Sequence, residues 1–200
     1  MTEPQPLEVP EATEGDRPRS LDEVVHRIVG EIENDRMSPG EVAELRRLEP
    51  DRTPGAAFWK TLAFHVEPAG QLRDTDTDAE ERWKLILRAI GELHSLHRRG
   101  RRPGRALAAA KISEMRLTRL LRADLDGLAA NLRAVSHQLA SAGEPVDLGG
   151  LAWLVTTARG AGKPNRRQDR VRHAIALDYY RGLRRAAADS HPDPNQETRS

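Results

Sequence analysis

Apolar residues recur along most of the chain at the three- and four-residue spacing of one helix face. The spacing predicts helices over about residues 20–33, 38–48, 56–65, 78–97, 113–122, 124–142, 145–155 and 167–187. Ser20–Glu23 and Ser38–Glu41 have the pattern of a capping box, which marks a helix start. Alternating Val, Ile and Thr runs, typical of strands, are nearly absent. We therefore expect an all-α fold, a compact bundle of about seven to nine helices.

The ends of the chain differ from this pattern. Residues 1–19 are rich in Pro and Glu, and the residues after His191 are also polar, so we expect disordered tails at 1–19 and 188–200 around a single all-α domain at 20–187. No signal peptide and no apolar run of membrane-spanning length is evident, so the expected location is cytoplasmic, with no membrane partner. The absence of cysteine excludes disulfides and thiolate chemistry.

The same periodicity predicts which large apolar side chains are buried. In residues 56–65 we expect Phe58, Trp59 and Phe64 to belong to the core, with a base-stacking platform as the alternative. Met115 is expected in the buried stripe of residues 113–122. Leu177 and Tyr180 are expected on the inner face of the last helix.

Charge is distributed unevenly, although the formal net charge is only +1. Residues 1–50 carry 6 basic and 13 acidic side chains, residues 51–97 carry 6 and 8, and residues 98–200 carry 20 and 10. A polyanion-binding surface should therefore come mostly from the second half of the chain.

Residues 97–124 concentrate nine basic residues, Lys111 among them. Gly100, Pro103 and Gly104 interrupt the run from Arg98 to Arg105, which predicts an exposed basic turn. After it, the three arginines Arg116, Arg119 and Arg122 form a strip along one helix. Glu114 is the sole acid between Arg98 and Arg122, so we expect that local acids do not satisfy this charge and that the region binds a polyanion.

The sequence contains no complete motif for phosphate-loop, zinc or calcium binding. The loop at 160–167 resembles a P-loop but has Thr157 and Pro164 where Gly and Ser or Thr are required. His94 and His97 with Glu92 do not make a zinc site, and the acids of residues 74–78 lack the pattern of an EF-hand. Without a hydrolase, zinc-protease or dinucleotide motif, we expect a protein that is not an enzyme and needs no cofactor or metal.

One stretch resembles a known family. Residues 104–124, Gly-Arg-Ala-Leu-Ala followed by Ile-Ser-Glu-x-Arg-Leu-x-Arg-Leu-Leu-Arg-Ala-Asp, look like the signature of the CasB family, the small subunits of the type I-E CRISPR surveillance complex Cascade. Further features follow in the family's order: Leu45-Arg46-Arg47, the helix of Pro54 and Ala57-Phe58-Trp59, Asn131-Leu132-Arg133, and Pro145-Val146-Asp147. The resemblance covers about residues 25–185.

The resemblance implies an all-α, non-catalytic protein that packs as two copies along the belly of Cascade. Its expected partners are the large subunit, the backbone subunits, the guide-processing subunit, a second copy of itself, the guide RNA and the target DNA with its displaced strand. Basic surfaces would support the R-loop without reading sequence, because base pairing reads the sequence in such complexes.

The resemblance and the charge pattern together give a set of expected nucleic-acid contacts. They are Arg46, Arg47, Arg105, Lys111, Arg116, Arg119, Arg122 and Arg133, with Lys163, Arg166 and Arg167 added for their charge and their place in a turn. Ala134 stands where family members often have a second basic residue, so the helix of Arg133 could contribute less to binding unless neighbouring arginines compensate. The acidic N-terminal half is expected to dock against neighbouring protein subunits.

Two other functions stay open at this point. A helix-turn-helix DNA-binding regulator would use the helix from Ser113 as its recognition helix, although Ser113 and Glu114 are poor phosphate contacts at its start. A purely structural helical scaffold would pair its arginines with a partner's acids and would not bind nucleic acid.

Overall fold

The residues that we describe, 20–72, 78–158 and 166–189 of a computed structural model, are mostly helical and contain no β-strand. The α-helices of this part are α1 (Leu21–Glu33), α2 (Pro39–Arg46), α3 (Ala56–Thr61), α4 (Ala79–Leu93), α5 (Pro103–Ala109), α6 (Glu114–Arg122), α7 (Leu125–Ala142), α8 (Leu148–Thr156) and α9 (Arg166–Asp189). A π-helical segment, Leu62–Val66, follows α3, and a 3-10 segment, His94–Leu96, follows α4. The expected all-α bundle is confirmed.

Both predicted capping boxes are present at the first two helix starts. Ser20 Oγ accepts the Glu23 N–H at 3.3 Å, and the Glu23 carboxylate accepts the Ser20 N–H at 2.9 Å. Ser38 and Glu41 form the same reciprocal pair at the start of α2. Each box satisfies N–H groups that a helix start otherwise leaves without a partner, which explains why four-residue motifs located both starts.

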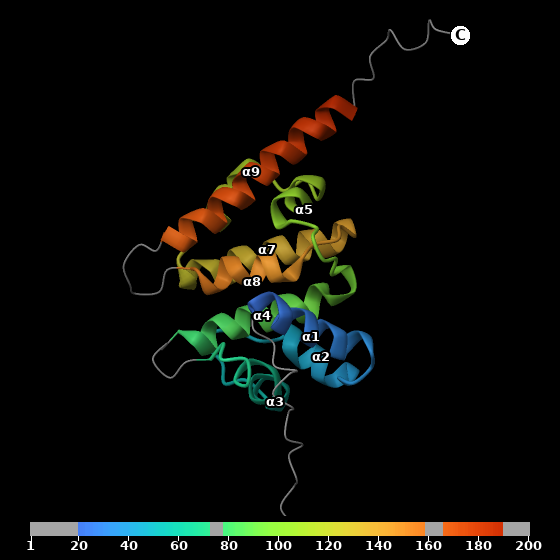
Figure 1. Ribbon diagram of the computed structural model, residues 1–200, viewed down its shortest axis with the longest axis vertical. Coiled ribbons are helices and arrows are strands. Elements are labelled where there is room, and N and C mark those ends of the chain that lie inside the picture. Colours follow the sequence, from blue (N-terminus) through green and yellow to red (C-terminus); the bar gives the residue numbers. More distant parts are fainter. Residues whose placement is uncertain (1–19, 73–77, 159–165, 190–200) are drawn as a thin grey trace, which may run out of the picture.

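Helix α4 lies at the centre of the molecule (Figure 1) and packs against α2 on one side and against α7 and α8 on the other, whereas α1 packs mainly against α8. Every residue from Trp83 to Gly91 is buried, including two cations. Lys84 Nζ donates to the carbonyl oxygen of Pro50 at 2.9 Å, and Arg88 donates to that of Leu48 at 3.0 Å. These bonds offset part of the cost of burying two charges and connect α4 to the segment after α2.

Helices α5 and α9 pack closely against each other near one end of the molecule (Figure 1). A Cβ at Gly104 would lie 2.2 Å from the carbonyl oxygen of Ile175, and one at Gly182 would lie 2.8 Å from Ala108 Cβ. The expected exposed turn from Arg98 to Arg105 is therefore wrong in its second half. Pro103 is the first residue of α5, where its missing N–H costs nothing, and Gly104 is buried against α9.

The expected burial of the aromatic side chains in residues 56–65 is only partly confirmed. Phe58 is fully buried, but Trp59 is 45% exposed and Phe64 is 57% exposed. The π-helical turn after Thr61 changes the residue spacing, so that the face predicted for Phe64 turns to solvent.

Three further side chains that we expected inside lie outside. Met115 is 63% exposed, Tyr180 is 48% exposed and Leu177 is 40% exposed. On α6 the buried side chains are Leu117 and Leu120, whereas Met115 lies on the face of the arginines. On α9 Ile175 and Tyr179 fill the interface, which leaves Leu177 and Tyr180 on the outer side.

Several expectations concern residues outside the described ranges. They are residues 1–19 and 190–200 of the two tails, residues 160–165 of the loop with Lys163, and the acids Asp74 and Asp76. Ala188 and Asp189, which we expected in the C-terminal tail, belong to α9. Among the described helices, none is long and apolar enough to cross a membrane.

Candidate nucleic-acid interface

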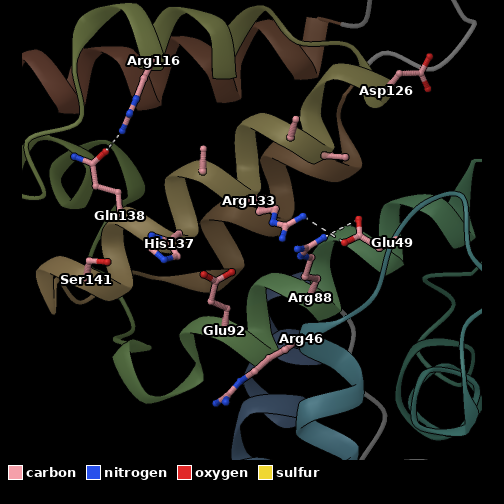
Figure 2. A pocket seen from close by; sticks show the side chains of 13 residues that line it. Arg46, Glu49, Arg88, Glu92, Arg116, Asp126, Arg133, His137, Gln138 and Ser141 are labelled. Atoms are coloured by element: carbon pink, nitrogen blue, oxygen red, sulfur yellow. Dashed lines mark hydrogen bonds and ion pairs between the residues drawn. The ribbon is translucent and has the colours of Figure 1, made fainter.

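A groove of about 1100 Å³ lies between α7 and the paired helices α2 and α4, and α6 closes one side of it (Figure 2). Three of the expected contact residues line it: Arg46 from the end of α2, Arg116 from α6 and Arg133 from α7. Buried Arg88 of α4 lies in the same groove. The fold thus places cations from four different helices along one groove.

Arg46 is fixed at one edge of this groove. Its Nε donates to the carbonyl oxygen of Gly91 at 2.6 Å, and its Nη2 lies 3.3 Å from His94 Nε2. Burial lowers the pKa of His94, and the charge of Arg46 lowers it further, so the imidazole stays neutral and can accept this hydrogen bond. Arg46 therefore has an ordered position at this edge.

Glu49 bridges two arginines inside the groove (Figure 2). Its Oε2 lies 3.1 Å from Arg88 Nη1, and its Oε1 lies 3.4 Å from Arg133 Nη1. The side chain of Arg133 is 61% exposed, so its pair with Glu49 is open to solvent and to a competing anion. In sequence, Glu49 and Arg133 are 84 residues apart, and no motif predicted that they meet.

The strip on α6 divides between the groove and the open surface. Arg116 Nη1 donates to Gln138 Oε1 on α7, and Gln138 Nε2 donates in turn to the carbonyl oxygens of Ala110 and Lys111. These bonds direct Arg116 toward the groove. Arg119 and Arg122 are exposed on the outer face of α6.

Three other expected contacts, Arg47, Arg105 and Lys111, lie outside the groove. Arg47 is exposed at the C-cap of α2 and lines a separate hollow of about 350 Å³ with Arg52. Arg105 is half-buried on α5, close to Gly182 of α9. Lys111 is exposed just after α5, in a left-handed backbone conformation with φ of 55°.

Arg166 and Arg167 are exposed at the start of α9. The Arg167 guanidinium lies 4.4 Å from the centroid of the Trp153 ring, which is a cation–π contact. The indole N–H of Trp153 donates to Asp22 Oδ2 at 2.9 Å, so this group connects α9, α8 and α1.

The basic turn is partly neutralised by acids that are distant in sequence. Arg101 pairs with Glu144 at 3.3 Å, and Arg102 pairs with buried Asp178 at 3.3 Å. Neither acid is local in sequence, because Glu144 follows α7 and Asp178 lies on α9, so it is tertiary packing that brings these acids to the turn. Arg98 and Arg99 are exposed.

Residues 96–101 and 146–147 are joined by hydrogen bonds that we call the clasp. The N–H groups of Arg98 and Val146 donate to the carbonyl oxygens of Val146 and Leu96, at 3.0 and 2.9 Å. Asp147 N–H donates to the carbonyl oxygen of Arg101 at 2.8 Å, and Gly100 N–H donates to Asp147 Oδ2 at 2.7 Å. The clasp fixes the basic turn to the start of α8.

Beside the clasp, His26, His97 and Asp147 form a cluster that the sequence did not reveal. The two imidazole centroids are 4.7 Å apart, and His26 Nε2 lies 3.8 Å from Asp147 Oδ1. Burial lowers the pKa of both histidines. His97 Nδ1 accepts the Leu148 N–H at 3.2 Å, so the neutral ring carries its proton on Nε2 and has no lone pair there for a metal. The cluster therefore adds side-chain contacts at Asp147 and Leu148 to the backbone hydrogen bonds of the clasp.

The charged side chains of the groove are of both signs. The groove combines four arginines with Glu49, Glu92 and Asp126. Guanidinium groups bind phosphate oxygens through paired N–H donors, whereas acids at the same surface disfavour close approach. Charge and spacing pointed to the arginines, but no local pattern pointed to Glu49 or Gln138, which position them.

Comparison with known proteins gives a family for this chain. No curated protein and no solved structure matches it. The family model described as "CRISPR-associated protein Cse2" matches residues 41–180, which include the groove and the α6 strip. The resemblance seen in the sequence is confirmed, and the chain belongs to the Cse2 family, the small subunits of the CRISPR surveillance complex Cascade.

Proposed function

We propose that this protein is a non-catalytic subunit that binds nucleic-acid backbones without sequence preference, and so stabilises the R-loop of guide RNA and target DNA and holds the displaced strand. The observation that carries the proposal is that Arg46, Arg116 and Arg133 line the same groove. A strand in this groove would release condensed counterions at each phosphate that an arginine neutralises.

The groove suits backbone binding better than base reading. Its cations lie on four different helices, whereas a recognition helix presents several base-contacting residues near its own start. Glu114, at the start of α6, accepts a hydrogen bond from the Tyr180 hydroxyl at 3.2 Å and so is engaged with α9. This contact counts against the helix-turn-helix alternative.

The proposed partners are the large subunit, the backbone subunits, the guide-processing subunit and a second copy of the chain. The acidic residues of the first 50 positions and the basic residues after position 97 support docking between opposite charges, with one copy's acidic end against a basic surface of its neighbour. The guide RNA and both DNA strands are the proposed nucleic-acid partners.

The first test is purification of the tagged chain from its native host, with identification of bound proteins and RNA. We expect several CRISPR-associated subunits and a repeat-containing guide RNA. Recovery of the chain alone, or with one discrete duplex DNA site, would contradict the proposal and favour a regulator.

The second test changes the groove within the assembled complex. We expect the triple variant Arg46→Gln, Arg116→Gln and Arg133→Gln to lower R-loop stability while assembly is retained. A matched variant, Arg36→Gln, Arg52→Gln and Lys60→Gln, removes the same charge from exposed positions outside the groove. Equal R-loop lifetimes for the two variants would leave the scaffold function as the better explanation.

A further inference from the structure

Helix α9 carries a second basic surface, separate from the groove. With 24 residues it is about 36 Å long, and its C-terminal end extends beyond α5 (Figure 1). Arg170, Arg181, Arg184 and Arg185 are all exposed on it. Their spacing of 11, 14 and 15 residues from Arg170 is close to three and four helical turns, so all four lie on one outer face that we call the α9 ridge.

The inner face of α9 explains why the ridge points outward. Ile175, Asp178 and Tyr179 are buried against α5, where Gly104 allows the two backbones to approach closely. The Tyr179 hydroxyl donates to the carbonyl oxygen of Ile112 and fixes the rotation of α9. Arginines on the opposite face therefore cannot turn inward without breaking this interface.

The charge of the α9 ridge is largely uncompensated. Within the described ranges, no carboxylate makes an ion pair with Arg170, Arg184 or Arg185. Arg181 lies 3.8 Å from Asp178, but that carboxylate also pairs with Arg102 at 3.3 Å. All seven basic residues of α9 are arginine rather than lysine, which favours paired hydrogen bonds to phosphate oxygens.

An exposed aromatic ring lies beside these arginines. Tyr180 is 48% exposed, its hydroxyl donates to Glu114 Oε2, and its ring meets Tyr179 edge to face at 5.3 Å between centroids. A ring fixed in this way next to guanidinium groups is a surface on which an unpaired base can stack. Leu177 extends the apolar surface on the same side.

The position of the α9 ridge relates it to the groove. Helix α6 contacts both α7 and α9, through Arg116 with Gln138 on one side and Glu114 with Tyr180 on the other. The exposed residues Arg119 and Arg122 of α6 therefore lie between the two surfaces. The family match ends at residue 180, so three of the four ridge arginines lie beyond it.

We propose that the α9 ridge, with Tyr180 as a stacking surface, is a second binding site for the backbone of single-stranded nucleic acid. This inference rests on the proposed function and adds a strand path over α6 to the outside of α9. A strand that leaves the groove would remain in contact with arginines along that path.

The first experiment measures binding of the full chain to a fluorescein-labelled, mixed-sequence single-stranded DNA, to the same sequence as RNA, and to the DNA duplex, over a salt series. The ridge variant is Arg170→Gln, Arg184→Gln and Arg185→Gln, which leaves the pair of Arg181 with Asp178 in place. Three lost contacts should lower the salt slope for a single strand by about two. The control is the variant of Arg36, Arg52 and Lys60, which should keep the slope.

The groove variant of Arg46, Arg116 and Arg133 separates the two proposals. A normal slope in the ridge variant together with a reduced slope in the groove variant would overturn the α9 ridge and leave the proposed function in place. The reverse pattern would overturn the groove and support the ridge. Equal losses on duplex and single strand would overturn the preference of the α9 ridge for a single strand.

A second measurement covers the case in which the isolated chain binds too weakly. A photocrosslinking benzoylphenylalanine replaces Leu177 on the ridge side, Ala134 in the groove, or exposed Phe64 as a control, in the complex purified through the tagged chain. We expect nucleic-acid adducts from the first two positions and not from the control. Protein adducts, or none, from position 177 would overturn the ridge proposal.

Discussion

The carboxylate of Glu49 pairs with two arginines, one buried in the core and one exposed in the groove. Arg88 is only 9% exposed and requires partners for its charge, and Glu49 with the carbonyl oxygen of Leu48 provides them. The other oxygen of Glu49 holds Arg133, which is the groove residue that the proposed function needs for phosphate. Glu49 therefore stabilises the core through Arg88 but lowers the affinity of the groove for phosphate by occupying Arg133.

We expect Glu49→Gln to tighten nucleic-acid binding and to lower stability. Removing the negative charge that competes with a phosphate for Arg133 should favour binding by about 1 kcal/mol, or roughly fivefold, at low salt, which is the Coulomb energy of two unit charges about 4 Å apart in water. Arg88 would keep the carbonyl of Leu48 but lose its ion pair, at a cost of about 1–2 kcal/mol. Filter binding and urea unfolding measure the two effects, and weaker binding would show that Glu49 does not compete for Arg133.

His97 gives a pH dependence with a definite sign. Burial lowers its pKa from the ordinary value of 6.5, so below that pH the unfolded chain binds a proton that the folded chain does not. The free energy of unfolding should therefore fall as the pH falls from 7 to 5. His26, His65 and His94, whose pKa values burial also lowers, act in the same direction.

We expect His97→Asn to make this pH dependence shallower. The Asn carbonyl oxygen can replace Nδ1 as acceptor for the Leu148 N–H, but it does not titrate. Thermal midpoints measured across this pH range would show the difference. An unchanged slope would mean that the other histidines account for the effect.

At the scale of elements, the contact of α5 with α9 depends on two glycines, of which Gly104 has the closer contact with backbone atoms. We expect Gly104→Ala to destabilise the protein by about 3 kcal/mol, because the new methyl group would meet backbone atoms of Ile175 and Tyr179 that cannot move aside separately. Gly30→Ala in α1 is the matched control, since a Cβ there meets nothing within 4 Å. That change should stabilise by about 0.5–1 kcal/mol, and urea unfolding distinguishes the two directions.

Some helix boundaries and buried faces were predictable from the sequence, and others were not. Both N-terminal helix starts were predictable because a capping box is complete within four residues. Helix α5 was missed because Pro103 and Gly104 usually interrupt helices, whereas here one starts the helix and the other allows α9 to approach. Periodicity misplaced Met115 and Tyr180, since it identifies a helix face but not which neighbours cover its edges.

For the candidate site, the sequence identified several cations but not their surroundings. The charge run and the resemblance pointed to Arg46, Arg116 and Arg133, and the structure brings these together. Their partners Glu49 and Gln138 come from other parts of the chain and carry no motif of their own. Such pairs depend on tertiary packing, which a single sequence does not display.

At the scale of the whole molecule, the acidic end around α1 and α2 is the proposed docking surface for protein subunits. We expect Glu33→Lys with Asp35→Asn to reduce recovery of partner subunits, while the isolated chain still binds nucleic acid. Both side chains are exposed, and Asn tolerates the positive φ of 56° at position 35. Glu81→Lys with Asp169→Asn makes the same charge change elsewhere, and equal recovery of subunits with both variants would argue against docking at this end.

The clasp determines which part of the molecule unfolds as a unit. Because residues 96–101 are bonded to residues 146–147, the chain between them, with α5, α6 and α7, is a closed loop anchored at its base. Local unfolding of such a loop proceeds as a unit, since its ends cannot separate while the base bonds persist. Unwinding of the C-terminal turns of α9 would therefore leave Arg116 on α6 and Arg133 on α7 in the same position relative to each other.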